Sequence, residues 1–187
     1  VNIGEGDQFK PEFLEISPNN KIPAIVDPDG PDGKPISLFE SGAILVYLAS
    51  KTGMLLPRNL RDKWSTLQWL MFQMGGIGPR FGQLGFFHKF AGKDYADKRP
   101  RDRYVAESAR LLGVLDGRLR GRRWVMGDDY TIADIAIFPW VRNLVGFYEA
   151  GELVRFERFI QVRRALDAFV ARPAVQRGLS IPPAPTP

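Results

Sequence analysis

The sequence predicts an α+β protein in which a small N-terminal domain precedes an all-α helical bundle. Two short runs of apolar and β-branched residues, 24–26 and 36–39, flank a segment rich in Pro, Asp and Gly, which is the pattern of a β-hairpin. After residue 57 the apolar residues recur at helical spacing as far as residue 170. Strands that come first and helices that follow indicate two domains of an α+β fold.

The 187 residues divide into four parts, and their ordinary apolar content can fill a core. The N-terminal domain covers residues 1–52. A linker follows at 53–60, where Gly53 ends a helix and Pro57 breaks the pattern. The helical domain covers 61–180, and 181–187 is an extended Pro-rich tail.

The N-terminal domain starts with a weakly helical pattern over residues 7–16, in which Pro11 suits a first turn. The hairpin comes next, and its second strand runs directly into a helix. Ser41 is expected to be the N-cap of this helix, because a serine hydroxyl can accept a hydrogen bond from a free N–H of the first turn. Ala43, Ile44 and Tyr47 then follow at helical spacing.

The helical domain is predicted from amphipathic spacing and from one capping motif. The expected helices cover residues 61–74, 99–120, 135–141 and 156–170. Residues 75–79, Gly-Gly-Ile-Gly-Pro, interrupt the first as a kink or a break. Thr131 and Asp134 fit a capping box at the start of the third, whose apolar residues on all sides predict a buried, central helix.

The composition excludes several classes of function for this segment. It contains no cysteine and one histidine, so disulfides, thiolate metal sites and a cysteine nucleophile are excluded and no metal site is expected. No apolar run of 18 residues and no signal peptide is visible, so no membrane partner is expected. A net charge of +5 raises nucleic acid as a partner. The arginines are spread over several helices without interleaved exposed aromatics, so no nucleic acid is expected.

The hairpin and the helix that follows it offer groups that could bind a charged peptide. Pro23 stands at the start of the first strand, where its missing N–H costs no ladder bond. If the Ile22–Pro23 bond is cis, the C=O and N–H of Ile22 turn outward and can pair with an extended peptide. The helix start at Glu40 and Ser41 presents free N–H groups to a carboxylate, and Glu40 can hold an ammonium group.

Each of these residues also has a purely structural explanation. Ser41 can serve only as a helix cap, worth about 1 kcal/mol. Glu40 can be a solvated acid that suits the helix dipole, and Pro23 can be an ordinary edge-strand proline. Their occurrence together favours a binding site.

The sequence around Ile22-Pro23 and Glu40-Ser41 resembles that of the glutathione transferase family. The Ile22-Pro23 and Glu40-Ser41 pairs resemble those of the family as a whole, and the longer match, Gly6–Leu14 and Ser17–Pro23, is similar to its bacterial Nu class. The resemblance covers nearly the whole chain and implies a thioredoxin-like N-terminal domain with a cis Ile22–Pro23 bond. It further implies that the backbone of Ile22 pairs with the cysteinyl unit of glutathione, while Glu40 and Ser41 bind the γ-glutamyl end.

The resemblance also implies residues at the rim of the site, but it assigns no residue of this chain to orienting the glutathione thiolate. Gln8, Asn20 and Lys21 are expected to line the rim. Arg103, at the start of the helix over 99–120, can meet the glycine carboxylate of glutathione, although most arginines in such a place are only solvated. A thioredoxin-like domain needs a βαβ unit of about 30 residues before the hairpin. We therefore expect its first strand and helix, with the residue that orients the glutathione thiolate, upstream of Val1.

The resemblance implies an enzyme that binds glutathione or glutathione disulfide as substrate or co-substrate, without a metal. Its expected reaction is glutathione-dependent thiol–disulfide exchange, which reduces a small disulfide, with conjugation of an electrophile left open. A homodimer in the cytoplasm is expected. The alternative is a non-catalytic module of the same fold that serves binding or assembly, because the residue that would separate the two lies upstream.

Overall fold

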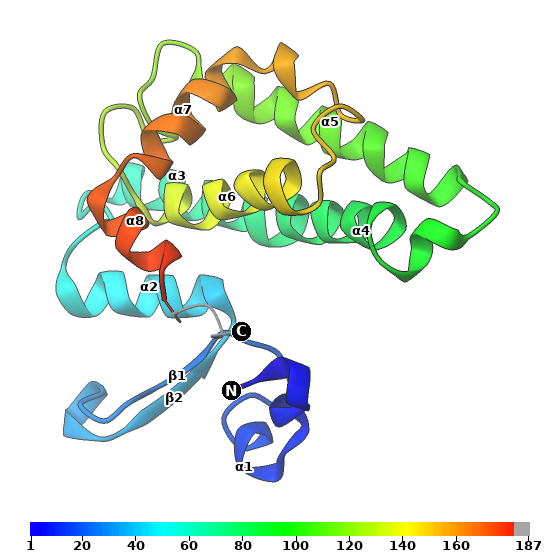
Figure 1. The fold of residues 1–187 in the computed structure, drawn as a ribbon. Helices are drawn as coiled ribbons and strands as arrows, with labels where there is room; N and C mark the ends of the chain where they lie inside the picture. The colour runs from blue at the N-terminus through cyan, green and yellow to red at the C-terminus, as the bar shows by residue number, and fades with distance from the viewer. Residues whose placement is uncertain (182–187) are drawn as a thin grey trace. The chain divides into compact units, whose positions relative to one another are not determined.

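A computed structural model of the chain describes residues 1–181, and the chain divides into two compact units, Val1–Arg58 and Asn59–Pro187 (Figure 1). The boundary falls inside the linker segment 53–60. Within residues 1–181 no helix combines the length and the apolar character needed to cross a bilayer. The Pro-rich tail expected at 181–187 lies, from residue 182 on, outside the described residues.

The N-terminal unit is built on a two-stranded antiparallel hairpin. Strand β1 (Ala24–Asp27) pairs with β2 (Ile36–Phe39) in a register that sets Ala24 opposite Phe39. The turn needs Gly30, because a Cβ there would lie 2.5 Å from the carbonyl oxygen of Lys34. Helix α2 (Ser41–Thr52) packs on both strands and ends at Gly53, whose φ of 68° is the left-handed cap that glycine favours.

The segment before the hairpin is short and only partly helical, as its weak pattern predicted. Two 3-10 turns (Ile3–Glu5 and Asp7–Phe9) lead to α1 (Pro11–Leu14), a single turn that begins with a proline. Phe13 is the buried residue of α1.

The prediction that Ser41 is the N-cap of α2 is wrong. The cap is Glu40, whose side chain makes no capping hydrogen bond, and Ser41 is the first residue of the helix. Glu40 has φ of 71° and ψ of 114°, a conformation that a side-chain-bearing residue adopts only rarely. This sharp change of direction lets β2 pass into α2 one residue earlier than the Ser-based capping pattern indicates.

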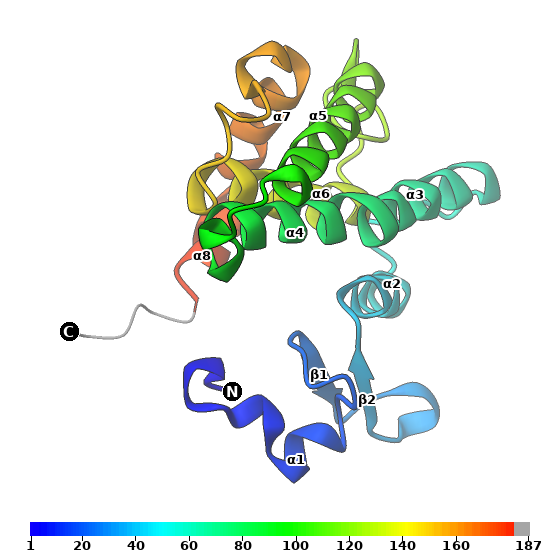
Figure 2. The same ribbon diagram turned by 90° about the vertical axis from the view of Figure 1, so that its right-hand side faces the viewer.

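Over residues 59–181 the helical unit contains six α-helices, two single π turns and two short 3-10 turns. Figure 2 shows how these helices follow one another along the chain. The helices are α3 (Leu60–Phe72), α4 (Gly78–His88), α5 (Arg99–Leu119), α6 (Ile132–Arg142), α7 (Ile160–Val170) and α8 (Pro173–Leu179). Helix α5 packs against α4 and α7, while α6 packs against α3 and α7. Their shared apolar faces form the core, in which Phe81, Leu112, Ile137 and Phe138 are completely buried.

The interruption predicted at residues 75–79 takes the form of a π turn, Gln73–Ile77, between α3 and α4. Such a turn inserts a residue without ending the helical rod. Gly78 follows it, and a Cβ at this position would lie 2.6 Å from Nε2 of Gln73 and 3.3 Å from the Trp140 ring. The glycine thus lets the rod pass closely by α6.

The capping box predicted at the start of α6 is confirmed. The Asp134 carboxylate accepts the backbone N–H of Thr131 and the backbone N–H of Val125, each at 2.9 Å, and Thr131 Oγ1 accepts the N–H of Ala133 at 3.3 Å. Asp134 is completely buried, and this burial raises its pKa. The acid therefore ties the loop before α6 to the helix, and the predicted central, buried helix is observed.

The last part of the chain differs from the prediction in two ways. The helix expected over 156–170 begins with a separate 3-10 turn (Phe156–Arg158), and α7 starts only at Ile160. Helix α8 was not predicted. Pro173, which follows the expected helix end at residue 170, is the first residue of α8, a position where its fixed φ and missing N–H are tolerated.

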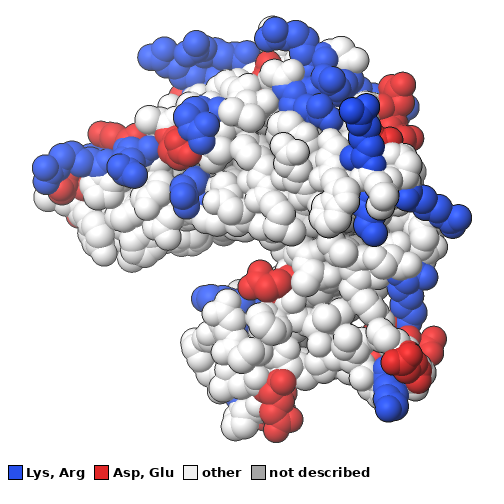
Figure 3. Space-filling view, turned by 180° about the vertical axis from the view of Figure 1, so that it is seen from behind, with Lys and Arg blue, Asp and Glu red and all other residues white. Residues whose placement is uncertain are grey.

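The excess of positive charge belongs to the helical unit. Asp and Glu outnumber Lys and Arg in residues 1–58, whereas Lys and Arg predominate after residue 59. On the face drawn in Figure 3, Lys and Arg side chains stand at several separate places, some of them beside Asp or Glu.

Candidate functional site

A hollow of about 210 Å³ opens where the start of β1 meets the start of α2. All of its walls belong to the N-terminal unit. The lining residues are Ser17, Asn19, Lys21, Ile22, Pro23, Phe39, Glu40 and Ser41. Pockets that hold a whole small ligand usually measure about 300 Å³ or more, so this hollow suits one end of a peptide-like molecule.

The peptide bond between Ile22 and Pro23 is cis, as the resemblance implies. The side chain of Ile22 is 53% exposed at the edge of the hollow. Among residues 1–181 no hydrogen-bond partner is found for its N–H or its C=O. A free donor and a free acceptor on one residue beside a strand are what an extended peptide pairs with.

The start of α2 forms the opposite wall of the hollow. Glu40 is exposed and Ser41 is half-buried. The first hydrogen bond of the helix runs from the N–H of Ile44 to the Glu40 carbonyl, at 3.0 Å. The N–H groups before Ile44 have no partner within the helix and point out of its N-terminal end. These amides and the positive end of a 12-residue helix can bind a carboxylate, and the Glu40 carboxylate can bind an ammonium group.

Three lining residues were not predicted from the sequence: Ser17, Asn19 and Phe39. Ser17 is completely buried and its hydroxyl donates a hydrogen bond of 2.8 Å to the carbonyl of Lys21. Phe39 is the last residue of β2 and is 38% exposed. Their nearness to Ile22 and Glu40 in sequence was the available signal, but their orientation depends on the fold of the loop.

Of the eight residues predicted to bind substrate, five line the hollow: Lys21, Ile22, Pro23, Glu40 and Ser41. Asn20 lies between two lining residues, with φ of 48°, and is not itself a lining residue. Gln8 lies in the 3-10 turn Asp7–Phe9 outside the hollow, and its Oε1 is buried with no partner among the described residues. Arg103 lies exposed on α5 in the helical unit, so this hollow does not include it.

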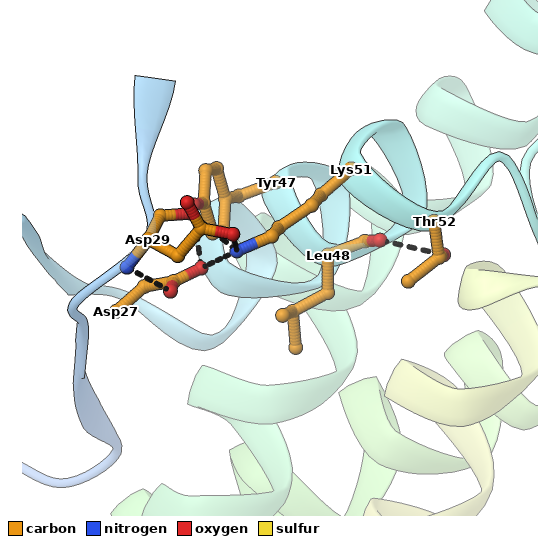
Figure 4. Close-up of polar contacts among 6 residues, drawn as sticks. All are labelled: Asp27, Asp29, Tyr47, Leu48, Lys51 and Thr52. Carbon is orange, nitrogen blue, oxygen red and sulfur yellow. Dashed lines mark hydrogen bonds and ion pairs between the residues drawn. The ribbon is translucent and has the colours of Figure 1, made fainter. Parts of the chain in front are cut away.

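A polar network fixes α2 to the far end of β1 (Figure 4). The Asp27 carboxylate accepts hydrogen bonds from Lys51 Nζ at 2.6 Å and from the Tyr47 hydroxyl at 2.7 Å. Lys51 also donates to the carbonyl of Asp29. The hydrogen bond from Lys51, together with that from Tyr47, lowers the pKa of Asp27 to about 2. Because Tyr47 and Lys51 lie one turn apart on α2, this network sets the helix against the strand that begins after Pro23.

No three His, Cys, Asp or Glu side chains within residues 1–181 lie together as a metal site would require. The residues that line the hollow offer backbone amides, hydroxyls, one ammonium group and one carboxylate. Groups of these kinds can bind and orient an amino acid or a peptide.

Comparisons with known proteins agree with this geometry. The domain family described as "Glutathione S-transferase, N-terminal domain" matches residues 1–51, and the one described as "Glutathione S-transferase, C-terminal domain" matches residues 79–173. Disulfide-bond oxidoreductase YfcG of Escherichia coli is 54% identical over 144 residues, which is 75% of this chain and 65% of YfcG. Disulfide-bond oxidoreductase YghU of the same organism is 42% identical over 95% of this chain and 61% of YghU.

Solved structures give the same result. A glutathione transferase from Burkholderia graminis, crystallised with two glutathione molecules per subunit, is 69% identical, with a TM-score of 0.96 over 98% of this chain and 77% of that one. A glutathione transferase from Pseudomonas putida, with one glutathione disulfide per subunit, is 65% identical, with a TM-score of 0.95 over 97% of this chain and 79% of that one.

The chain spans less than two thirds of the length of YfcG and YghU, at 65% and 61%. Both domain families of one superfamily nevertheless match it in the expected order, and the solved relatives align over nearly its whole length. The chain belongs to the glutathione S-transferase family.

Proposed function

We propose that the protein binds glutathione and glutathione disulfide at the hollow between β1 and α2 and reduces small disulfides with glutathione. The observation that carries this proposal is that one hollow brings together the Ile22 backbone, which has no partner among residues 1–181, the Glu40 carboxylate and the start of α2. The bound glutathione of the Burkholderia graminis relative and the oxidoreductase names of YfcG and YghU support it.

In this proposal glutathione lies across the hollow as an extended peptide. Its γ-glutamyl carboxylate meets the first amides of α2 and the Ser41 hydroxyl, and its ammonium group meets the Glu40 carboxylate. Its cysteinyl unit pairs with the N–H and C=O of Ile22 in the manner of an added strand. Lys21, Gln8, Asn20 and Arg103 remain proposed contacts at the rim and toward the glycine end.

The reaction consumes two glutathione molecules, because reduction of a disulfide takes two electrons and each glutathione supplies one when glutathione disulfide forms. The thiolate of one glutathione attacks a sulfur of the substrate disulfide, the S–S bond breaks, and one substrate thiolate leaves and takes up a proton. A second glutathione thiolate then attacks the glutathione sulfur of the mixed disulfide. The second substrate thiol and glutathione disulfide are released, so two glutathiones are oxidised and one disulfide is reduced.

A paired assay on the whole protein tests this reaction. Reduction of hydroxyethyl disulfide by glutathione is measured beside conjugation of a chlorodinitrobenzene-type electrophile, for the wild type and for Ser41→Ala. Ser41→Ala is expected to raise the KM for glutathione about tenfold, since it removes a hydrogen bond to a charged group. Ser50→Ala, on the exposed side of the same helix, is the matched control and is expected to leave KM unchanged.

The assay also separates the proposal from its alternative. Disulfide turnover that exceeds conjugation supports the reductase. Absence of turnover together with absence of glutathione binding in calorimetry contradicts it and leaves a non-catalytic module of the same fold. Conjugation faster than disulfide reduction would contradict the assignment as a reductase while leaving the glutathione site in place.

The proposal includes a homodimer, supported by an exposed apolar stripe on α3. Leu60, Trp64 and Met71 are 70%, 65% and 55% exposed. Their spacing of four and seven residues places them on one face of the helix, and exposed apolar side chains gathered on one face are typical of an interface. We expect Trp64→Glu to shift the protein toward monomer in sedimentation at micromolar concentration, and Gln83→Glu on α4 not to do so.

The proposal places the reaction in the cytoplasm. Reduction of a disulfide by glutathione proceeds only where the pool of glutathione is kept reduced. Fractionation of cells that express the whole protein checks this location, and recovery from an oxidising compartment would contradict it.

A further inference from the structure

Ser17 is the most deeply buried polar residue beside the hollow. Its side chain has no exposed surface, although it belongs to the loop that joins α1 to β1. A buried hydroxyl must find a partner to offset the loss of its contact with water. The partner here is the carbonyl of Lys21, which the hydroxyl reaches at 2.8 Å.

Ser17 also anchors the loop through its backbone. Its N–H donates to the carbonyl of Phe13 at 2.9 Å, and its own carbonyl accepts the N–H of Asn20 at 2.9 Å. Phe13 is buried at the end of α1, so this end of the loop is fixed. The chain reverses through Asn20, whose φ of 48° lies in the left-handed region that asparagine tolerates. The hydroxyl bond from Ser17 to Lys21 closes this reversal.

The carbonyl that Ser17 holds belongs to the same peptide group as the N–H of Ile22. The bond between Lys21 and Ile22 is trans, and a trans peptide is planar with its C=O and N–H directed to opposite sides. Fixing the direction of the Lys21 carbonyl therefore fixes the direction of the Ile22 N–H. This N–H has no partner among residues 1–181.

We propose that Ser17 is a positioning residue that aims the Ile22 N–H at the cysteinyl unit of bound glutathione. The inference rests on the proposed glutathione site. Ser17 acts through the Lys21–Ile22 peptide group. Without its hydroxyl this peptide group can rotate, and glutathione must then order it at the cost of affinity.

The chain provides a matched control in Ser108. Ser108 is also completely buried, on α5 of the helical unit, and its hydroxyl has no partner among the described residues. Ser17→Ala and Ser108→Ala therefore remove the same atom from equally buried places. One removal breaks a hydrogen bond of the site and the other does not.

The test measures binding of reduced glutathione by calorimetry and disulfide reduction by steady-state kinetics, on the whole protein. Ser17→Ala is expected to raise the Kd and the KM for glutathione about five- to tenfold, as expected for one lost hydrogen bond. At saturating glutathione its kcat is expected to stay within about twofold of the wild type. Ser17→Thr, which keeps the hydroxyl, is expected to recover most of the affinity, and Ser108→Ala is expected to bind like the wild type.

Several outcomes would overturn the inference. If the Ser17→Ala variant binds glutathione like the wild type, the Ser17 hydroxyl does not orient the Ile22 N–H for binding. An equal loss in Ser108→Ala shows that a buried serine matters only for packing. A lowered kcat with unchanged KM, in a protein with unchanged circular dichroism, places Ser17 in another role. If the wild type itself does not bind glutathione, the proposed function fails, and the inference fails with it.

Discussion

The Tyr47 hydroxyl donates a hydrogen bond of 2.7 Å to the Asp27 carboxylate and so joins the middle of α2 to the last residue of β1. Lys51, one turn further along α2, reaches the same carboxylate (Figure 4). The other ends of these two elements, Pro23 before β1 and Ser41 at the start of α2, border the hollow. The network therefore joins β1 and α2 away from the hollow, at residues that do not line it.

Loss of this network is expected to loosen the N-terminal unit. Tyr47→Phe removes one hydrogen bond, whereas Asp27→Asn removes the charge that both donors share. We expect faster amide hydrogen exchange in β1 and α2 for both variants, with the larger increase in Asp27→Asn. Thr52→Val is the control, because the Thr52 hydroxyl bonds only within α2, to the carbonyl of Leu48. Unchanged exchange in Asp27→Asn would show that packing alone holds α2 on the hairpin.

The same carboxylate gives the N-terminal unit a defined response to acid. Hydrogen bonds from Lys51 and Tyr47 lower the pKa of Asp27 from 3.8 to about 2 in the folded state. Its contribution to stability is therefore present above about pH 4 and is lost as the pH falls toward 2. We expect the difference in free energy of unfolding between the wild type and Asp27→Asn to shrink over this range. Urea titrations at pH 6, 4, 3 and 2 measure it, and a constant difference would contradict the prediction.

In the helical unit, the capping box at the start of α6 is expected to contribute more to the free energy of unfolding than an ordinary helix cap does. Asp134→Ala leaves the buried N–H groups of Val125 and Thr131 without an acceptor, and we expect it to lower the free energy of unfolding by about 2–4 kcal/mol. Thr131→Ala removes the weaker half of the box and is expected to cost about 1 kcal/mol. Asp128→Ala, in the exposed loop nearby, is the control. A loss in Asp134→Ala no larger than in Asp128→Ala, measured by chemical denaturation, would contradict the prediction.

The sequence predicts an element well where local chemistry decides it. The hairpin follows from β-branched residues around a turn of Pro, Asp and Gly, and the start of α6 follows from the Thr131–Asp134 spacing. Two details escape such patterns. The first is the N-cap of α2, which is Glu40. Its φ of 71° is a conformation that the surrounding structure imposes, so the local sequence does not reveal it. The second is helix α8. Local patterns do not predict it, because a proline that ends one helix can also be the first residue of the next, as Pro173 is here.

The site shows the same division between local and tertiary effects. Ile22, Glu40 and Ser41 are identifiable from the sequence because a proline at a strand start and a helix N-terminus are local features. Ser17 is not, because its hydroxyl comes to the hollow only when the loop folds back and brings the Lys21 carbonyl within 2.8 Å. The contacts expected of Arg103 and Gln8 stay predictions, because neither residue lines this hollow.

Two helical glycines are expected to respond in opposite ways to replacement by alanine. Gly85 lies buried in α4, and a Cβ there would lie 2.6 Å from atoms of the Tyr148 ring. That ring is nearly buried and packs edge-on against Phe90, so it has little room to move. Gly85→Ala is expected to lower the free energy of unfolding by about 1–3 kcal/mol, because an overpacked core must shift to accept the methyl group.

Gly117→Ala is the matched substitution on α5. Gly117 is exposed, and a Cβ at this position meets no atom within 4 Å. Alanine is therefore expected to raise the free energy of unfolding by up to about 1 kcal/mol, since it loses less backbone entropy on folding than glycine does. Guanidinium denaturation of the two variants measures both effects. If both substitutions raise the free energy of unfolding, the prediction for Gly85 is contradicted. The Tyr148 ring must then be able to move and make room for the new methyl group on α4.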